Sequence, residues 1–504
     1  MTARTWWAEM AWLGGPDAVS GVRIDCNADG TIIDVVPGAP RPENPGIEVL
    51  RGLTVPGLVN CHSHAFHRAL RAWTQSAGGD FWSWRTLMYQ VAERIEPDAY
   101  LDLATAVYAE MLLAGITTVG EFHYLHHDRN GRAYQNEAME AAIVEAARTA
   151  GIRITVLDTC YLTGGIGPAS EASLSVGPGV GALPAEPLQG AQRRFSDGSV
   201  DGWLARLEAA SRSLSGPTVR FGAAVHSVRA VPREGLDEIA AAMAPSGTGP
   251  NGTASSGTGP NGTAPSGTGP NGTGRSGMPI HAHVSEQTAE NAACVRAWGL
   301  TPTQLLGEAG LLGPAFTAVH ATHLEARDVD LLGTSGSSVC VCPTTERDLA
   351  DGIGPTVALR RAGVPLCLGS DSHAVIDLLE EARAVELDER LASGRRGSHS
   401  PADLLQAATG SGSRSLGWED VGRIAVGAQA DLCSFDLSGV DVAGTFTARG
   451  ANAASALVFA TRGASPQEVV VAGRTVVKDG HHVGLGDVAK HMSEAIAAVM
   501  GRGE

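Results

Sequence analysis

The amino-acid sequence predicts an α/β protein, with a (β/α)8 barrel of the TIM type and a small β-sandwich-like domain formed by the two ends of the chain. Helical and strand-like segments alternate through the centre of the chain, strand-like segments with tight turns gather at both ends, and several central strands close on a histidine or an aspartate. Repeated βα units of this kind favour a closed parallel barrel. An open doubly wound sheet is the alternative, but no Gly-x-Gly-x-x-Gly segment stands in a βα turn to support it.

The N-terminal segment, residues 1–55, is predicted to form the first part of the β domain. Residues 21–25 and 31–36 are rich in β-branched side chains, and residues 27–30, Asn-Ala-Asp-Gly, separate them. Asn, Asp and Gly in so short a link are typical of a β-hairpin turn. We therefore expect two antiparallel strands here.

The C-terminal segment, residues 421–504, has the same character and is predicted to complete this domain. Residues 430–436 and 469–477 are strand-like, and the second run contains a central glycine turn. A helix is expected at the C-terminus. Since the two ends of the chain carry the same kind of segment, we expect them to form one β unit beside the central domain.

The central residues 56–420 are predicted to form the barrel. Residues 97–114 carry apolar side chains at helical spacing and are followed by a glycine, and residues 116–120 then form an apolar run. The same order returns with a helix at 136–150 and a strand at 152–157. Each pair is one βα unit of a parallel sheet.

One internal stretch, residues 245–277, does not fit this pattern. It repeats Ser-Gly-Thr-Gly-Pro-Asn-Gly-Thr and has almost no apolar content. Such a composition cannot bury a core, so we expect a disordered insertion in a surface loop of the barrel.

Composition excludes several classes of partner. The net charge of −17 argues against nucleic acid and against an anionic membrane surface, although a local arginine cluster can still bind a small anion. No apolar run is long enough to span a bilayer, and residues 1–13 lack the pattern of a secretory signal. The eight cysteines have no framework spacing, which predicts reduced thiols and a cytoplasmic protein.

Two histidines one residue apart, His62 and His64, follow the apolar run 53–61. Side chains at i and i+2 of a strand point to the same face, so two imidazoles can bind one ion from the end of a single strand. Imidazole suits zinc, iron, copper or nickel. Two ordinary polar residues at a strand end are the alternative interpretation.

The other predicted strand ends decide between these interpretations, because they carry the same kind of side chain. The polar residues that close apolar runs further along the chain are His226, His281, His283, His320 and Asp371. Barrel enzymes place their sites at the carboxyl ends of the strands. Several such ends bearing His or Asp are hard to explain by packing, and we expect them to converge.

The chain resembles the amidohydrolase superfamily, specifically its deaminase branch. The segments that carry the resemblance are 56–64, 283–286, 320–323 and 369–373. Within the branch the chain resembles the formimidoylglutamate deiminases, through segments that deaminases in general do not share: 64–69, 81–85, 121–128 and 192–195.

The resemblance implies a metal site and the groups that act beside it. The implied metal ligands are His62, His64, His283 and Asp371. Glu286 would be a proton shuttle, His320 would sit beside the water that attacks, and Asp371 would also take the proton of that water. His281 shares a strand face with His283 and is the competing ligand, but the family's His-x-x-Glu spacing favours His283, and we expect His281 to fill a layer of the barrel.

The lysine count bears on the number of ions. Many two-metal members of the superfamily bridge their ions with a carboxylated lysine, but the only lysines here are Lys478 and Lys490, at the C-terminal end. We therefore expect one divalent ion. Zinc is favoured by the ligand set, and iron(II) is the alternative.

The resemblance also implies a substrate, N-formimidoyl-L-glutamate, which would be hydrolysed to N-formyl-L-glutamate and ammonia in histidine degradation. Its two carboxylates call for arginine, whose guanidinium binds them bidentately. The implied substrate-binding residues are His67, Arg85, Tyr124, His226 and Arg229. His67 stands where members of this family tend to carry glutamine.

Two other functions remain open from the sequence. One is deamination of an aminated ring, such as guanine, a pterin or a compound like S-adenosylhomocysteine. The other is a non-catalytic barrel that serves as a scaffold, although such proteins usually lose their metal ligands. The expected partner is a small anionic substrate, with neither nucleic acid nor membrane, and we expect a homodimer because barrels of this branch often pair.

Overall fold

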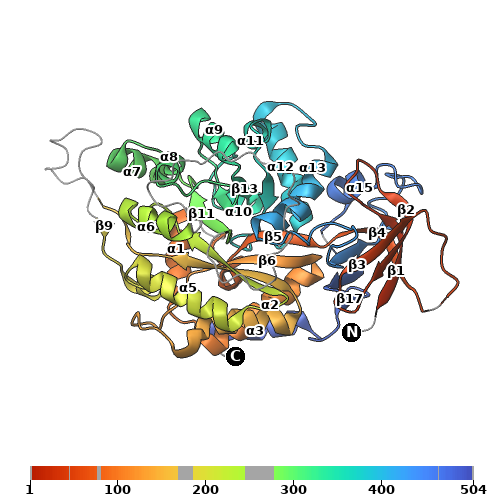
Figure 1. Cartoon of the computed structure of the whole chain (residues 1–504), viewed down its shortest axis with the longest axis horizontal. Helices are drawn as coiled ribbons and strands as arrows, with labels where there is room; N and C mark the ends of the chain where they lie inside the picture. The colour runs from red at the N-terminus through yellow and green to blue at the C-terminus, as the bar shows by residue number, and fades with distance from the viewer. Residues whose placement is uncertain are drawn as a thin grey trace, which may run out of the picture.

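In the computed structural model of the chain, the described residues are 3–44, 46–75, 81–167, 185–244, 277–463 and 465–501. They form a barrel surrounded by helices and a second sheet beside it, with the chain passing from one to the other near both ends (Figure 1). The insertion predicted to be disordered, 245–277, lies outside the described residues except for Gly277.

The barrel consists of eight parallel strands in the order β14-β13-β12-β11-β10-β7-β6-β5. Their bounds are β5 Leu58–Ser63, β6 Ile116–His123, β7 Arg153–Cys160, β10 Val219–Val225, β11 Ile280–Val284, β12 Phe316–His320, β13 Ser338–Val341 and β14 Leu366–Leu368. A parallel bridge between Ser63 and Asp371, with Asp371 N donating to the His62 carbonyl at 3.0 Å, links the last strand to the first. The predicted TIM-type barrel is confirmed.

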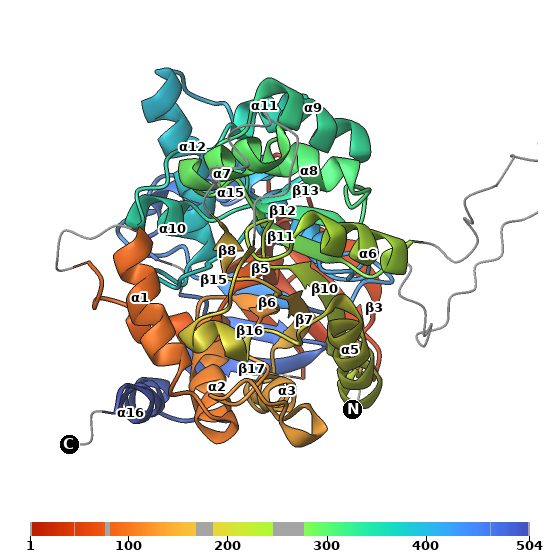
Figure 2. The same cartoon turned by 90° about the vertical axis from the view of Figure 1, so that its left-hand side faces the viewer.

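These segments are strands because both of their faces are covered. Every residue of β6, Ile-Thr-Thr-Val-Gly-Glu-Phe-His, is buried, and so is every residue of β7. Parallel strands with helices outside and a packed interior carry such near-continuous apolar and β-branched runs. The helices lie around the strands when the barrel is viewed from the end that carries β8 (Figure 2).

Helix boundaries follow local chemistry. Helix α2 (Pro97–Leu113) begins with proline at its first position, and α3 (Ala138–Ala150) ends at Gly151 in the left-handed conformation, φ 86°. The other long helices around the barrel are α1 Phe81–Ala92, α5 Val200–Leu214, α6 Arg233–Met243, α7 Thr288–Trp298, α9 Ala326–Ser335 and α12 Leu378–Ser393. Shorter ones are α8 Pro302–Glu308, α10 Pro343–Asp348, α11 Thr356–Arg361, α13 Pro401–Gln406, α14 Gly412–Ser415 and α15 Ala453–Ala460.

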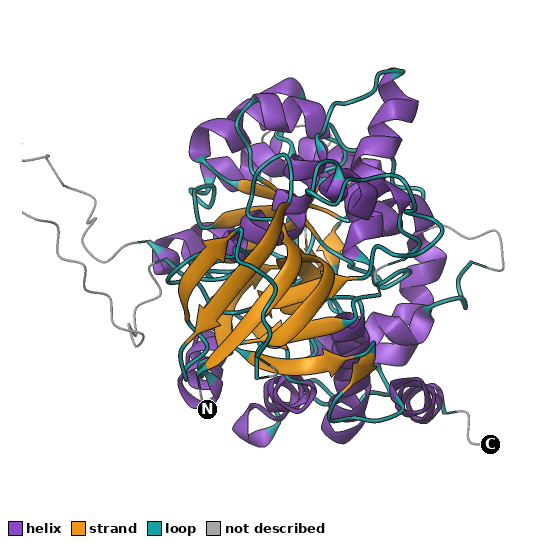
Figure 3. Cartoon of the chain, turned by 90° about the vertical axis from the view of Figure 1, so that its right-hand side faces the viewer, coloured by secondary structure: helices purple, strands orange, loops and turns teal. Residues whose placement is uncertain are grey.

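The two ends of the chain build one continuous sheet, which Figure 3 shows beside the barrel. Its order is β18-β17-β16-β15-β4-β1-β2-β3, so β4 from the N-terminal segment pairs with β15 from the C-terminal segment. The bounds are β1 Arg4–Ala11, β2 Val19–Cys26, β3 Ile32–Pro37, β4 Glu48–Pro56, β15 Leu432–Phe435, β16 Glu468–Val471, β17 Arg474–Lys478 and β18 His481–His482. The expected shared β unit is therefore present, while the boundaries at residues 55 and 421 stay predictions.

Three further features complete the fold. Helix α16 (Val488–Met500) lies at the C-terminus and packs against α2. Strands β8 (Gly165–Ile166) and β9 (Ala185–Glu186) pair antiparallel near the mouth of the barrel. Among the described helices, none has both the length and the apolar character that crossing a bilayer requires.

Candidate active site

Side chains from separate strands meet at the carboxyl end of the barrel. His62 lies in β5, His283 in β11 and His320 at the end of β12, while Asp371 follows β14. The backbone at His320 (φ 66°) and at Asp371 (φ 42°) is left-handed. This conformation costs a non-glycine residue about 1–3 kcal/mol, so the surrounding structure must hold both residues there.

The donor atoms of the predicted metal ligands lie close together. The distance from Asp371 Oδ1 is 3.3 Å to His62 Nε2 and 3.4 Å to His64 Nε2, and His62 Nε2 lies 3.1 Å from His283 Nε2. Bonds of about 2.1 Å to a tetrahedral ion place neighbouring donors about 3.4 Å apart. The spacing therefore suits one small cation.

The hydrogen bonds of the imidazoles also suit a cation. His64 Nδ1 lies 3.0 Å from the Phe122 carbonyl and His283 Nδ1 lies 2.8 Å from the His226 carbonyl. A carbonyl can only accept, so each Nδ1 carries the proton and each Nε2 lone pair faces the other donors. Burial lowers the pKa of His62 to about 3, which keeps this ring in the neutral form that binds metal.

The structure distributes the ligands between two overlapping groups in which all donor atoms lie within 4.8 Å of one another. One contains His62, His283, His320 and Asp371, and the other contains His64, His67 and Asp371. His64 thus joins the first group through Asp371. His281 is in neither group among the described residues, and its Nε2 lies 2.8 Å from the Ser415 carbonyl inside the barrel.

His320 stands between two carboxylates. Its Nε2 lies 3.9 Å from Glu286 Oε1 and 3.9 Å from Asp371 Oδ2, too far for hydrogen bonds but close enough for one small molecule to bridge. Burial lowers the pKa of His320, but the carboxylates of Glu286, Glu346 and Asp371 reverse this and raise it to about 10. A cation beside Asp371 would oppose that rise.

Asp371 is ionised in this setting. Burial raises its pKa, but the adjacent imidazoles of His62 and His64 and the charge of His320 more than compensate, so the pKa falls well below the usual value. The site therefore combines one permanent carboxylate with neutral imidazole nitrogens. This is a donor set for zinc or iron.

A pocket of about 340 Å³ opens beside these groups. Of the eleven site residues predicted from the sequence, those that line it are His64, His67, Arg85, Tyr124, His226, Arg229, His283, Glu286, His320 and Asp371. His62 lies below, fully buried against His283. The predicted substrate-binding residues and the predicted metal ligands thus share one pocket.

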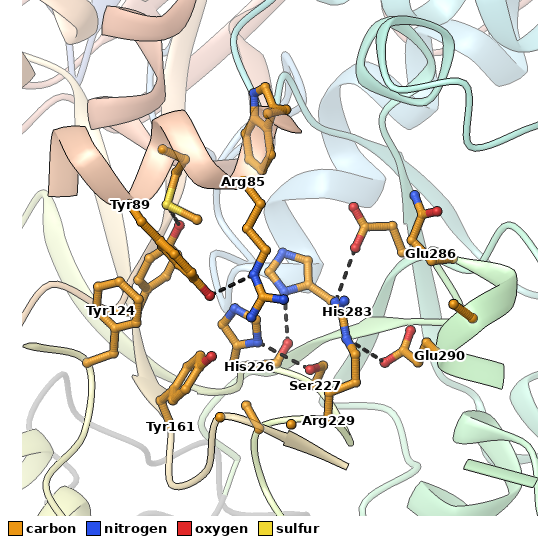
Figure 4. Close-up of a pocket in the computed structure, with 18 of the residues that line it drawn as sticks. Arg85, Tyr89, Tyr124, Tyr161, His226, Ser227, Arg229, His283, Glu286 and Glu290 are labelled. Carbon is orange, nitrogen blue, oxygen red and sulfur yellow. Dashed lines mark hydrogen bonds and ion pairs between the residues drawn. The ribbon is translucent and has the colours of Figure 1, made fainter. Parts of the chain in front are cut away.

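Two arginines enter this pocket from different elements. Arg85 comes from α1 and Arg229 from the loop after β10, and Figure 4 shows both side chains extending into the pocket near His226 and His283. Arg85 Nε donates to the Tyr89 hydroxyl at 2.6 Å. Arg229 NH2 lies 3.4 Å from Glu286 Oε2.

Aromatic rings and neutral histidines form another part of the wall. His67 Nε2 lies 2.9 Å from the Tyr124 hydroxyl, and the His67 ring lies 4.4 Å from that of His64. His226 lies 4.6 Å from Tyr161. Burial lowers the pKa of both His67 and His226 well below the usual value, so these rings stay neutral.

Sequence reasoning missed several side chains that support these groups. Glu346 Oε1 accepts from Cys342 N and lies 3.5 Å from His320 Nδ1. Glu121, buried behind β5, accepts from Ala65 N at 2.6 Å and from the Ser63 hydroxyl at 2.7 Å. Glu121 lies in the segment 121–128, which carries part of the family resemblance, whereas no periodicity in the sequence singles out Glu346.

A hydrogen-bonded group behind Arg85 was also missed. Gln192 Nε2 donates to the hydroxyls of Tyr161, at 3.0 Å, and Tyr89, at 3.2 Å. The Tyr89 hydroxyl in turn accepts from Arg85. Tyr89 lies four residues after Arg85 on the same helix face, and this spacing was the available signal.

Comparison with known proteins agrees with this geometry. The model of the amidohydrolase family matches residues 53–476. A formimidoylglutamate deiminase of Pseudomonas aeruginosa is 33% identical over 92% of this chain and 92% of its own length. An 8-oxoguanine deaminase of the same organism is 30% identical over 97% of this chain and 96% of its own length.

Among solved structures, an amidohydrolase from Brucella melitensis superposes with a TM-score of 0.82 and 27% identity, covering 99% of this chain and all of the other. The match extends over the barrel and the terminal sheet alike. With histidine and aspartate donors gathered at the mouth of such a barrel, the chain belongs to the amidohydrolase family of hydrolases, among its deaminases.

Proposed function

We propose that this protein hydrolyses N-formimidoyl-L-glutamate to N-formyl-L-glutamate and ammonia, with one divalent ion. The observation that carries the proposal is the pair Arg85 and Arg229, which enters the same pocket as the metal-type donor set. Guanidinium groups are the preferred partners of carboxylates, and this substrate has two. The deiminase of Pseudomonas aeruginosa, similar over nearly the whole chain, adds support.

The ion would be held by His62, His64, His283 and Asp371, whose donor spacing fits it. Zinc is the preferred choice for three imidazoles and one carboxylate. When bound, it supplies Lewis acidity, which allows water to ionise near neutral pH.

Three side chains would then move or hold protons. Asp371 Oδ2 accepts the proton of the attacking water, and His320 donates a hydrogen bond to the attacking oxygen. Glu286 delivers a proton to the departing nitrogen, so that ammonia leaves instead of an amide anion. The two 3.9 Å separations around His320 Nε2 leave room for the reacting atoms. General acid–base help of this kind is worth about 10²- to 10⁴-fold.

The remaining pocket residues would orient the substrate. Arg85 and Arg229 each bind one carboxylate, and Tyr124, His67 and His226 offer hydrogen bonds to the backbone of the glutamyl group or to the formimino nitrogen. The cationic formimino head would face Asp371 and Glu286, while the two carboxylates would contact the guanidinium groups. This charge complementarity would fix the direction of binding.

Deamination of an aminated ring is a second candidate. The pocket wall holds Trp84, Tyr124, Tyr161 and Phe195, which could stack on a ring. The 8-oxoguanine deaminase of Pseudomonas aeruginosa favours the same candidate. A non-catalytic scaffold is favoured less, because the donor set is complete.

Ammonia release distinguishes these candidates. Zinc-loaded protein is assayed with N-formimidoyl-L-glutamate, 8-oxoguanine and S-adenosylhomocysteine. We expect the linear amidine to be preferred, and Arg85→Ala to raise its KM about tenfold or more through loss of one carboxylate contact. A preference for either ring refutes the proposal, and protein that binds neither zinc nor iron supports the scaffold.

A further inference from the structure

Arg229 lies between two acidic side chains that follow β11. Its NH2 atom lies 3.4 Å from Glu286 Oε2, and its Nε atom lies 3.5 Å from Glu290 Oε1. Figure 4 shows the guanidinium passing between the two carboxylates at one side of the pocket. The three side chains are at most 17% exposed, so water screens these ion pairs only weakly.

Glu290 is a buried acid that the proposed reaction does not use. It lies in the first turn of α7, and neither of its oxygens has a hydrogen-bond partner within the described part of the chain. Burial raises its pKa, and the charge of Arg229 opposes that rise. A buried carboxylate is costly unless it is paired with a cation. We therefore expect Glu290 to keep its ion pair with Arg229 Nε, whichever group contacts Arg229 NH2.

Glu286 is shared between Arg229 and the reaction centre. Its Oε2 faces Arg229, while its Oε1 lies 3.9 Å from His320 Nε2. A proton shuttle must be able to turn between water and the leaving nitrogen. The pair with Arg229 opposes this rotation.

We propose that Arg229 is a latch on Glu286 that a substrate carboxylate opens. In the free protein Arg229 holds Glu286, and a carboxylate of the substrate displaces Glu286 from NH2 while Glu290 retains Nε. Glu286 is then free to move protons. The inference rests on the proposed function, since it requires a substrate that brings a carboxylate to Arg229.

With such a latch, the carboxylate of a substrate affects kcat as well as binding affinity. An amidine without a carboxylate can enter the pocket, but it leaves Glu286 paired with Arg229. It should therefore be turned over slowly even at saturation, and a separate carboxylate should restore the rate. Simple anchoring by Arg229 predicts no such restoration, because the added acid would not touch the bound amidine.

The test uses N-propylformamidine, which has the reacting group but no carboxylate, with and without propionate. For the zinc-loaded wild type we expect kcat to rise about tenfold at saturating propionate, after subtraction of the rate without protein. In Arg229→Gln, which lacks the guanidinium that propionate would bind, propionate should not raise kcat. Arg233→Gln, which removes a half-exposed ion pair between Arg233 of α6 and Glu308 of α8, is the matched control and should respond like the wild type.

If propionate does not raise the rate of N-propylformamidine hydrolysis by the wild type, whether that rate is zero or measurable, the latch is refuted. If Arg229→Gln does not fold, the wild type crystallised with N-formyl-L-glutamate gives a second readout. We expect Glu286 to have left Arg229 NH2 while Glu290 remains at Nε, and an intact Arg229–Glu286 pair refutes the latch. Wild type that releases no ammonia from N-formimidoyl-L-glutamate refutes the proposed function, whereas turnover of that substrate with no propionate effect refutes the latch alone.

Discussion

At the scale of single residues, position along the barrel axis decides what a side chain does. His281 and His283 lie on the same face of β11 but differ by two residues, which is about 6.6 Å along a strand. His283 reaches the mouth and faces His62, whereas His281 bonds to the Ser415 carbonyl in the interior. The strand pattern alone could not separate them, because both satisfy the alternation of a strand face.

A glycine beside the metal ligands gives the residue-scale prediction. A Cβ on Gly369 would lie 2.7 Å from His62 Cβ and 2.9 Å from Cys342 Sγ, so Gly369→Ala must displace His62 or the end of β14. We expect a loss of about 1–3 kcal/mol in unfolding free energy, as for other overpacked cores, and at least about tenfold weaker zinc binding. Urea unfolding and zinc competition with a chelator measure the two effects.

Gly216→Ala is the matched control, because a Cβ there meets nothing within 4 Å and the backbone is not left-handed. It should leave both quantities near their wild-type values. A folded Gly369→Ala protein with unchanged zinc affinity would contradict the view that this contact fixes His62.

At the scale of elements, the sequence predicted best where pattern and boundary chemistry agree. The run 219–225 is β10 to the residue, and the helix expected at 97–114 is found at Pro97–Leu113. The strand expected at 116–120 continues to His123, because the polar residues Glu121 and His123 are buried in the barrel. A polar residue at a strand end carries no sign of burial in the sequence, since its partners come from distant elements.

Helices α3 and α5, strand β7 and the loop before α5 meet in one buried charge network. Arg206 of α5 pairs with Glu140 of α3 at 2.9 Å, with Asp197 at 2.8 Å and with Asp158 of β7. Burial raises the pKa values of Glu140 and Asp197, but their histidine and arginine partners lower them overall. Both carboxylates therefore have lower pKa values in the folded state than in the unfolded chain.

The direction in which the unfolding free energy changes with pH follows from proton linkage. A carboxylate with a lowered folded pKa adds stability above its unfolded pKa, about 4, and this is lost as pH falls through the folded value. We expect the unfolding free energy to drop steadily below about pH 5. Arg206→Gln should cost about 3–5 kcal/mol at pH 7, because it leaves buried carboxylates without their cation, and should flatten the acid dependence. Urea titrations between pH 3 and 8 measure both, and an unchanged slope in the variant contradicts the assignment.

At the scale of the whole molecule, topology assembled what the sequence could not. The strand-end residues were predictable, because parallel strands in a barrel bring their carboxyl ends together. Glu290 and Glu346 were not, since they come from helices whose rotation about their axes depends on the complete packing. The sequence therefore predicts the metal-type donor set better than it predicts the residues that hold the arginines and His320.

The joint between barrel and terminal sheet gives the last prediction. Arg153, at the start of β7, binds Asp431 through Nε at 3.0 Å and NH2 at 3.1 Å, and its guanidinium lies 4.6 Å from the Trp418 ring. Both side chains are almost completely buried. Asp431 immediately precedes β15, and it also accepts a hydrogen bond from Ala472 N, between β16 and β17. The pair therefore connects the barrel to two places in the terminal sheet.

This joint lies at the amino end of the barrel strands, opposite the candidate active site, so it should affect stability without affecting chemistry. Asp431→Asn should cost about 3–5 kcal/mol, because it leaves the Arg153 charge buried without a counter-ion. Replacing both partners, Arg153→Met with Asp431→Leu, should cost clearly less than the sum of the single changes, since no charge is then stranded. Arg212→Met, at an exposed pair with Glu208, is the control and should cost less than about 1 kcal/mol. Thermal and urea unfolding measure the losses of stability. The value of kcat/KM at low temperature should remain at the wild-type level. A loss of kcat/KM in folded Asp431→Asn protein would show that the terminal sheet shapes the site across the length of the barrel.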